Sequence, residues 1–279
     1  MQSDGALLRF SQDKRALFST VLSATGDRDF PKANYISHGI PVRELKSKSD
    51  RKVLFVGDSL IEQYYPKVNE LHKKGLGHIW FITEPSCLPI KGMFKAGKVC
   101  DKIDKTAEYL EGKLFDIIVV TGYWFPYINE ISPYYIKENG KDYSFNSKKG
   151  SQIVDARIKD IFSVFKQHSK KIYFLMPTPT GYMFSPKEIS RKIFVEEDIF
   201  SPVQKSFFSE KYQKFYDYIG QLSTEFDFEL IDPMDDLCKN DYCFVVDKDG
   251  NPFYKDRIHL RPKYVLENAH YLDILLKTN

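Results

Sequence analysis

The stretch Val53-Leu54-Phe55-Val56-Gly57-Asp58-Ser59-Leu60 decides the fold that we expect for this chain. Its four leading apolar residues, bounded by Lys52 and Gly57, are typical of a buried parallel strand, and the residues that follow have the composition of a helix. Ser59 therefore falls on a strand-to-helix turn. Such a turn exposes its hydroxyl at the carboxyl edge of a sheet, beside helix amides that favour negative charge. This is a good place for a nucleophile. The alternative is that Asp58 or Ser59 only caps the helix, the commoner role of an isolated Gly-Asp-Ser.

A second motif, Asp256-Arg257-Ile258-His259, lies about 200 residues later. A serine nucleophile needs a base to accept its proton and an acid to hold that base in one tautomer. Asp256 and His259, three residues apart, can supply both: Asp256 would orient the imidazole and His259 would abstract the proton. An Asp-x-x-His motif alone is weak evidence, because a lone histidine beside apolar residues is more often structural. The two motifs in this order, near the two ends of an alternating α/β pattern, are much stronger evidence.

Apolar runs alternate with helical patterns between these two motifs. The runs are residues 53–56, 78–83, 115–122, 171–176 and 228–232, and the third is the most apolar. Helical spacing of apolar residues follows the runs, at residues 59–74, 101–112, 154–165, 208–226 and 262–276. Pro66 predicts a kink in the first of these helices. The alternation predicts a three-layer α/β/α sandwich of flavodoxin-like type, with a parallel sheet of about five strands and the active site at its carboxyl edge.

Length and composition favour one compact catalytic unit. The chain has 279 residues, evenly spread aromatic residues (15%) and no Pro/Gly/Ser-rich linker. We expect a catalytic domain over residues 51–279, with an N-terminal extension over residues 1–50 packed on it. The extension should hold a short helix over residues 5–23 and then a segment that follows the surface. A tyrosine-rich segment over residues 128–150 should form an excursion over the site.

Charge and hydropathy exclude several classes of partner. Lys and Arg exceed Asp and Glu by only 41 to 38, and they are dispersed, so we expect no nucleic-acid binding. No run of about twenty apolar residues occurs, so nothing here should span a membrane. The N-terminus lacks the basic and apolar regions of a signal peptide, and no Gly-rich phosphate loop or metal-ligand cluster implies a cofactor.

The four cysteines point to a compartment other than the cytoplasm. They fall in two close pairs, Cys87 with Cys100 and Cys238 with Cys243, which suits two local disulfides in an oxidising environment. A zinc site is the competing interpretation, although these spacings match no common Cys-x-x-Cys motif. A soluble domain cut from a larger membrane protein reconciles the cysteines with the missing signal peptide.

The two motifs together resemble the SGNH (GDSL-like) hydrolases and acyltransferases. The resemblance is closer to the extracytoplasmic SGNH domains that are fused to, or work with, acyltransferase-3 membrane proteins that O-acetylate bacterial surface polysaccharides. It covers about residues 50 to 275. The further stretches that carry it are Gln63-Tyr64-Tyr65, Pro85-Ser86-Cys87-Leu88-Pro89, Trp124-Phe125-Pro126-Tyr127, the pair Cys238 and Cys243, and Asp249-Gly250-Asn251-Pro252-Phe253-Tyr254.

This resemblance implies a serine-dependent O-acyltransferase, with acetyl as the group and a surface glycan such as lipopolysaccharide as acceptor. Ser59, Asp256 and His259 would be its catalytic residues, and no metal or other cofactor is implied. An acyltransferase-3 membrane domain, fused or separate, would deliver the acyl donor on the periplasmic side of the inner membrane. Two alternatives use the same residues differently: a carbohydrate esterase with water as acceptor, and a non-catalytic glycan-binding module with a relic triad.

The oxyanion hole is where this chain departs from the wider family. Other members carry a glycine and then a Gly-x-Asn-like block, and the asparagine is missing here. Gly122, at the end of the third strand, is the expected close-approach position. Besides the Ser59 amide, the candidate donors are the backbone amides of residues 122–124, which we favour, and the indole of Trp124. Asp58 and Tyr127 complete the candidate substrate-binding set, and the aromatic side chains here suit either packing or sugar rings.

Overall fold

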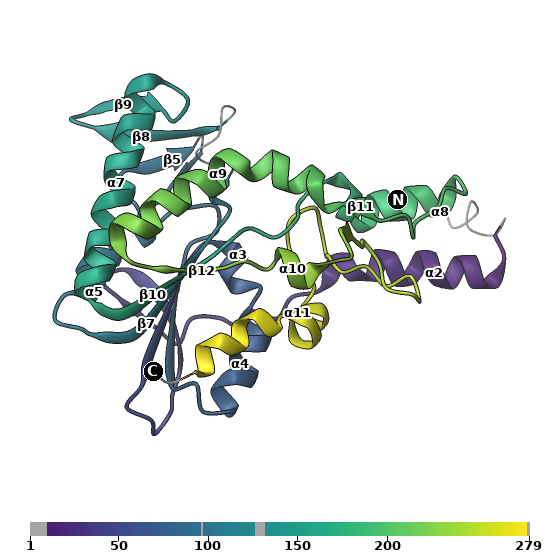
Figure 1. Ribbon diagram of the computed structural model, residues 1–279, viewed down its shortest axis with the longest axis horizontal. Helices are drawn as coiled ribbons and strands as arrows, with labels where there is room; N and C mark the ends of the chain where they lie inside the picture. The colour runs from purple at the N-terminus through teal and green to yellow at the C-terminus, as the bar shows by residue number, and fades with distance from the viewer. Residues whose placement is uncertain (1–9, 96, 126–131, 278–279) are drawn as a thin grey trace.

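A seven-stranded sheet forms the centre of the computed structural model, which describes residues 10–95, 97–125 and 132–277 (Figure 1). The strand order is β1-β2-β4-β3-β7-β10-β12. The five strands from β4 to β12 are parallel, and β2 and β1 continue the sheet in antiparallel pairing. This confirms the predicted sandwich with about five parallel strands. The strands are β1 (Tyr35–Ser37), β2 (Ile40–Leu45), β3 (Lys52–Gly57), β4 (His78–Thr83), β7 (Phe115–Thr121), β10 (Ser169–Leu175) and β12 (Glu229–Ile231).

Strand β3 is buried on both faces, as its unbroken apolar run predicts. Leu54 and Val56 enter one core, and Val53 and Phe55 enter the other. All four side chains are at most 1% exposed. Because successive side chains of a strand point to opposite faces, both layers of helices are anchored on the strand that leads to Ser59. Strand β7 lies beside β3 and is the middle one of the five parallel strands.

Helices cover both faces of the sheet (Figure 1). One face carries α5 (Thr106–Leu110), α7 (Lys148–Gln167) and much of α9 (Lys205–Phe226). The other carries α4 (Tyr65–Lys73), α11 (Pro262–Asn268) and the 3₁₀ helix η4 (His270–Leu276). The expected helix over 59–74 is divided into α3 (Ser59–Glu62) and α4, with Pro66 in the first turn of α4. Pro66 lacks the amide that would continue the ladder, so the predicted break lies where it should.

Part of the N-terminal region belongs to the main sheet. Strand β2 pairs with β4, and its Ile40 and Val42 are fully buried. Helix α2 (Gln12–Ser23) lies against α8 (Pro186–Phe194), and the two form the arm at the right of Figure 1. The 3₁₀ turn η1 (Ala24–Gly26) follows α2. Residues 24–50 therefore do more than follow the surface, while the division at residue 50 stays a prediction.

A second sheet, which the sequence did not predict, lies at the far end from that arm (Figure 1). Its order is β6-β5-β8-β9. The strands are β5 (Met93–Lys95), β6 (Lys98–Val99), β8 (Tyr134–Glu138) and β9 (Lys141–Ser144). Outside this sheet, the short 3₁₀ helices η2 (Ile103–Lys105) and η3 (Tyr182–Phe184) precede α5 and α8 in the chain. Much of the expected excursion over 128–150 is thus a hairpin that packs on α7, while its residues 128–131 lie outside the described residues.

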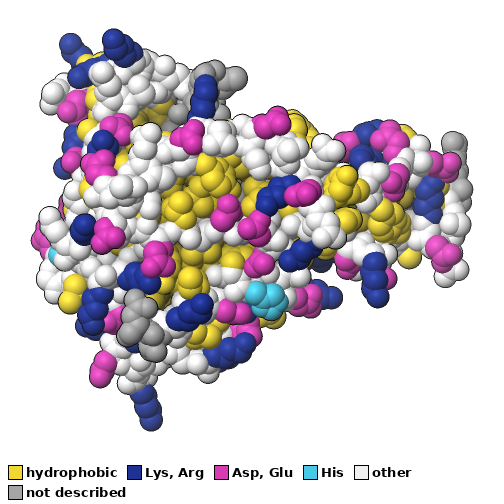
Figure 2. Space-filling view, viewed as in Figure 1, with side chains coloured by type: hydrophobic (Ala, Val, Ile, Leu, Met, Phe, Trp, Pro, Cys, Tyr) yellow, Lys and Arg dark blue, Asp and Glu magenta, His cyan; other side chains and the backbone are white. Residues whose placement is uncertain are grey.

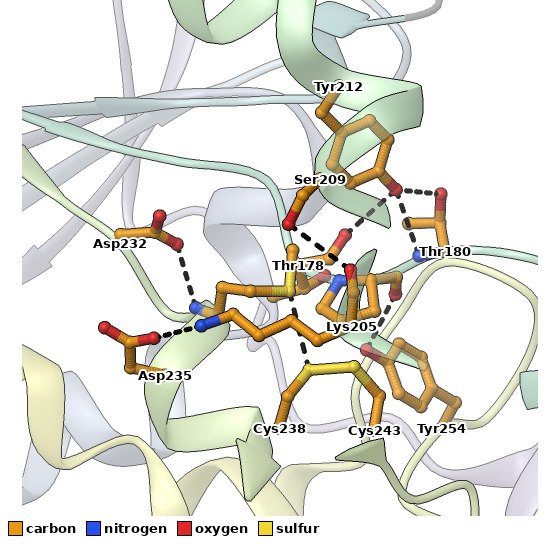
Figure 3. The surroundings of a disulfide bond; sticks show 12 residues. Thr178, Thr180, Lys205, Ser209, Tyr212, Asp232, Asp235, Cys238, Cys243 and Tyr254 are labelled. Atoms are coloured by element: carbon orange, nitrogen blue, oxygen red, sulfur yellow. Dashed lines mark hydrogen bonds and ion pairs between the residues drawn. A yellow bond between two sulfur atoms is a disulfide. The ribbon is translucent and has the colours of Figure 1, made fainter. Parts of the chain in front are cut away.

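The four cysteines form the two expected disulfides, Cys87–Cys100 and Cys238–Cys243. The second joins β13 (Cys238–Lys239) to β14 (Tyr242–Cys243) in a small sheet with β11 (Val203–Gln204), just after α10 (Met234–Leu237). Figure 3 shows this disulfide. Above it in that view, the Tyr212 hydroxyl is hydrogen-bonded to the Thr180 hydroxyl. Because each of the four sulfurs is bonded to its partner in one of the two disulfides, these cysteines are not zinc ligands.

Acidic and basic side chains are interspersed on the face of the molecule that Figure 2 shows, which agrees with the dispersed charge of the sequence. Among the residues that the structure describes, no helix has both the length and the apolar composition needed to cross a bilayer.

Candidate active site

Ser59, His259 and Asp256 form one hydrogen-bonded chain. The Ser59 hydroxyl lies 2.8 Å from His259 Nε2, and His259 Nδ1 lies 2.8 Å from Asp256 Oδ2. A carboxylate can only accept, so Nδ1 carries the proton and Nε2 is left to accept from the serine. The structure thus brings together the three residues that the sequence singled out, across 200 residues of chain. The geometry is that of a nucleophile, a base and an orienting acid.

Asp256 is held as an anion by its surroundings. Its Oδ1 accepts from the amides of Ile258 and His259, each at 2.8 Å, while Oδ2 faces the imidazole. Burial raises the pKa of Asp256, but the hydrogen bond and charge of His259 and the two amides outweigh burial and lower the pKa to about 2. The carboxylate is therefore ionised at any neutral pH and fixes the tautomer of His259.

The turn before Ser59 is shaped by Gly57 and Asp58. A Cβ at Gly57 would overlap the carbonyl oxygen of Thr121 on the neighbouring strand, so only glycine allows this approach. Asp58 is the N-cap of α3, because its Oδ1 accepts from the Leu60 amide at 2.8 Å. The capping role that competed for Ser59 thus falls to Asp58, which leaves the Ser59 hydroxyl to His259.

Asp58 also connects the serine turn to the loop after β7. Its Oδ2 accepts from the Tyr123 amide at 2.8 Å. The amide of Tyr123 is therefore engaged and is not available as an oxyanion donor. Of the donors suggested by the sequence, this leaves the amides of Ser59, Gly122 and Trp124 and the indole of Trp124.

Trp124 lies in the core beneath this loop. Its side chain is fully buried, and its ring packs edge-on against Phe174 with centroids 5.3 Å apart. Its indole Nε1 has no hydrogen-bond partner among the described residues, and a Cβ at Gly122 would lie 2.9 Å from it. Gly122 is thus a close-approach position, as expected. Burial of Trp124 favours packing over stacking on a sugar ring, and Tyr127 lies outside the described residues.

Gln63 joins the serine helix to the histidine loop, a role that the sequence motifs do not predict. Its side-chain Oε1 accepts from the Leu260 amide at 2.7 Å, and Gln63 is only 8% exposed. Leu260 directly follows His259, so this bond fixes the distance between the two motifs. No periodicity in the sequence indicates it, because the two residues are 197 positions apart.

A cavity of roughly 670 Å³ opens over Ser59 and His259. Its walls come from residues 25–30, from the start of α8 at Ser185 and Lys187, and from residues 255–262. None of the described residues of the 128–150 segment lines it, so the described part of that excursion does not cover the site as expected. The segment after α2 does so instead, and an ion pair of 2.6 Å between Asp27 and Arg261 holds it there.

Glu62 also lines this cavity. Its Oε1 accepts from the Thr83 hydroxyl at 2.6 Å. Burial raises its pKa, with a smaller contribution from the charge of Asp58, against the opposing hydrogen bond from Thr83. Glu62 is therefore easier to neutralise than an ordinary surface carboxylate.

A protein-family model for the SGNH domain described as fused to AT3 domains matches residues 27–270. The chain belongs to this SGNH family. The match begins at residue 27 and so includes β1 and β2, whereas the resemblance read from the sequence began near residue 50. It also spans both the Gly57-Asp58-Ser59 and the Asp256-x-x-His259 motifs.

The fold of this SGNH domain is shared with a solved bacterial structure. The lipopolysaccharide acetyltransferase periplasmic domain of Salmonella ser. Paratyphi A superposes with a TM-score of 0.60 at 13% identity, covering 83% of this chain and 85% of that chain. At this identity the likeness establishes a common fold. No match is found among curated proteins.

Proposed function

We propose that this SGNH domain is a serine-dependent O-acyltransferase that acetylates a bacterial surface polysaccharide through an acyl-enzyme on Ser59. The observation that carries the proposal is the unbroken hydrogen-bonded chain from the Ser59 hydroxyl through His259 to Asp256. Its place at the carboxyl edge of a parallel sheet, below an open cavity, gives both substrates access to the hydroxyl.

The first half-reaction loads the enzyme. Ser59 Oγ attacks the carbonyl carbon of the acyl donor while His259 Nε2 takes the hydroxyl proton, and Asp256 stabilises the resulting imidazolium. The amide of Ser59 and a donor from residues 122–124 would hold the negative charge on the carbonyl oxygen. Collapse of this intermediate breaks the bond to the leaving group, which receives the proton from His259. The product is an acyl ester on Ser59.

The second half-reaction reverses these roles. A sugar hydroxyl enters the cavity, His259 Nε2 takes its proton, and the sugar oxygen attacks the acyl carbon. The Ser59 oxygen leaves and recovers the proton from His259, so the enzyme is regenerated and the sugar carries the ester. No charge or atom is left over, and no cofactor takes part in either half.

The cellular context of the proposal rests on the family and on the disulfides. Members of the family are described as fused to AT3 domains. Two disulfides suit an oxidising compartment. We therefore propose an extracytoplasmic domain on the periplasmic side of an inner-membrane protein, whose acyltransferase-3 domain delivers the acyl group. The alternative that the same geometry supports is a carbohydrate esterase in which water replaces the sugar.

The test is Ser59→Ala, measured with an acetylated sugar as donor and a second glycan as acceptor. Asp58 supplies the N-cap, so the variant should keep its melting temperature, while turnover should fall by about 10⁵-fold or more. Activity within tenfold of the natural chain would remove Ser59 as the nucleophile. Counting free acetate against acetylated acceptor separates esterase from transferase. A serine-directed phosphonate that leaves Ser59 unlabelled would instead favour a binding module.

A further inference from the structure

Basic side chains gather around the active-site cavity from three separate segments. Arg28 comes from the segment after α2, Lys187 from the first turn of α8, and Lys255 and Arg257 from the loop that carries Asp256. All four line the same cavity as Ser59. These segments are far apart in sequence and meet only in the folded chain. The distribution of charge along the sequence therefore does not predict this group of basic side chains.

These basic groups have few partners. Among the described residues, Arg28 and Lys187 form no hydrogen bond or ion pair through their side chains, and both are exposed. Arg257 packs over the ring of Tyr182, with its guanidinium carbon 4.7 Å from the ring centroid. Arg191, another exposed arginine, is by contrast paired with Glu188 and Glu197.

The acidic groups of the cavity are mostly occupied. Asp27 is paired with Arg261 at 2.6 Å, and Asp256 is bonded to His259. Glu62 accepts from Thr83, and burial raises its pKa. Asp29 is the one acid of the cavity lining for which the described residues offer no such partner. Four basic and four acidic side chains line the cavity, and Arg261, just outside this lining, is paired with the acidic Asp27. Among the described residues, Arg28 and Lys187 are therefore basic groups of the cavity that no acidic side chain pairs.

We propose that this cavity selects an acceptor sugar that carries a negatively charged group, a carboxylate or a phosphate ester. Guanidinium groups recognise such planar or tetrahedral anions through paired hydrogen bonds, and lysines add charge without fixed geometry. The proposal rests on the proposed function, since it names the substrate class of that same site. An acidic residue of the glycan held by Arg28, Lys187, Lys255 and Arg257 would bring a neighbouring sugar hydroxyl to the acyl group on Ser59.

The test measures binding rather than turnover, so its outcome does not depend on catalysis. Ser59→Ala protein is titrated calorimetrically with an oligogalacturonide, which carries carboxylates, and with a neutral malto-oligosaccharide of equal length. We expect the acidic oligosaccharide to bind at least tenfold more tightly, and its affinity to fall as salt is raised. Equal affinity for the two oligosaccharides would overturn the proposal, even if Ser59 is the nucleophile.

Charge-removing variants locate the effect. Arg28→Gln combined with Lys187→Gln should weaken oligogalacturonide binding by about tenfold or more, with the melting temperature unchanged because neither side chain is packed or bonded. Lys166→Gln is the matched control: Lys166 is an exposed lysine near the end of α7, at the opposite edge of the sheet, and its loss should change nothing. A double variant that binds as tightly as its parent overturns the proposal.

A final arm distinguishes acceptor from donor. Coenzyme A and acetyl phosphate also carry phosphate groups, so each is titrated into the same Ser59→Ala protein and the same double variant. Binding of the uronic-acid chain that is lost in the double variant, without comparable binding of either phosphate donor, supports an anionic acceptor. Donor binding alone would assign the basic groups to the acyl donor and would refute the acceptor proposal.

Discussion

Asp256 acts on the reaction through the tautomer of His259. Replacing it with asparagine keeps an oxygen for the amides of Ile258 and His259, so the loop should stay in place. The asparagine NH₂ group would then face Nδ1, which favours the proton on Nε2 and leaves nothing to accept from Ser59. We expect Asp256→Asn to lower kcat by about 10⁴-fold, as the corresponding change does in a serine protease.

The measurement is ester hydrolysis followed beside the thermal unfolding of the same samples. An unchanged melting temperature with a large loss in kcat supports an orienting role. A variant with more than a tenth of the natural kcat would show that His259 keeps its tautomer without Asp256.

Glu62 should make the free energy of unfolding depend on pH. Its pKa is raised in the folded chain, chiefly by burial, so the folded state binds this proton more readily than the unfolded state does. Stability from this group is therefore present below the unfolded pKa of about 4.3 and is lost as pH rises through the folded pKa. Glu62→Gln keeps an oxygen for Thr83 and removes that loss.

We expect Glu62→Gln to melt at a higher temperature than the natural chain at pH 7 to 8, with the difference vanishing below about pH 4. Glu111→Gln, at an exposed glutamate after α5, is the control and should show no such gain. A Glu62→Gln variant that is less stable at pH 8 would mean that the charged carboxylate has a favourable partner.

The sequence identifies those site residues that lie in short motifs, and it does not identify those that depend on distant pairs. Ser59, Asp256 and His259 lie in short motifs whose chemistry is readable within four residues. The engaged amide of Tyr123 and the link from Gln63 to Leu260 depend on pairs brought together by the sheet. Such contacts leave no local pattern in the sequence. The Tyr123 amide could therefore be excluded from the candidate oxyanion donors only from the structure.

At the scale of elements, one side-chain bond sets the distance between the serine helix and the histidine loop. Gln63→Ala would leave the buried Leu260 amide without its acceptor, which costs about 1–3 kcal/mol. Because Leu260 adjoins His259, we expect kcat to fall about tenfold or more as well, with less change in KM.

Gln213→Ala is the matched control, since Gln213 is an exposed glutamine on α9 whose side chain donates to Asp217, within the same helix. Urea unfolding and steady-state hydrolysis, measured on both variants, separate the two effects. If Gln63→Ala loses stability but keeps the natural kcat, the bond supports the fold without positioning the base.

The long parallel strands could be predicted from sequence, whereas the short antiparallel ones could not. Strands β3, β7 and β10 each contain an apolar run of four residues that is buried on both faces of the sheet. Strands β5, β6, β8 and β9 have two to five residues each and mix polar with apolar side chains. Their pairing depends on distant partners, so neither their run length nor their period marks them out.

At the scale of the whole molecule, the N-terminal residues complete both the sheet and the site. Strand β2 adds a buried pair of side chains, Ile40 and Val42, to the edge of β4. The Phe30 ring lies 5.6 Å from that of Phe81, and Asp27 is ion-paired with Arg261 beside the cavity. Mixed composition and turn residues hid these roles in the sequence, which favoured a boundary near residue 50.

Two fragments test where the folding unit begins. A chain of residues 51–279 lacks β1 and β2, so it exposes the edge of β4 and loses two side chains whose burial is each worth about 1.5–3 kcal/mol. We expect it to aggregate or to unfold far below the natural melting temperature.

A chain of residues 27–279 keeps β2 and the Asp27 ion pair but loses α2, whose Phe18 and Val21 are buried. It should fold with a modestly lower melting temperature and retain Ser59-dependent hydrolysis. Size-exclusion chromatography, thermal unfolding and ester hydrolysis are measured on both. If the 51–279 fragment is monomeric, melts with the full chain and hydrolyses the ester at the same rate, residues 1–50 are a separable extension.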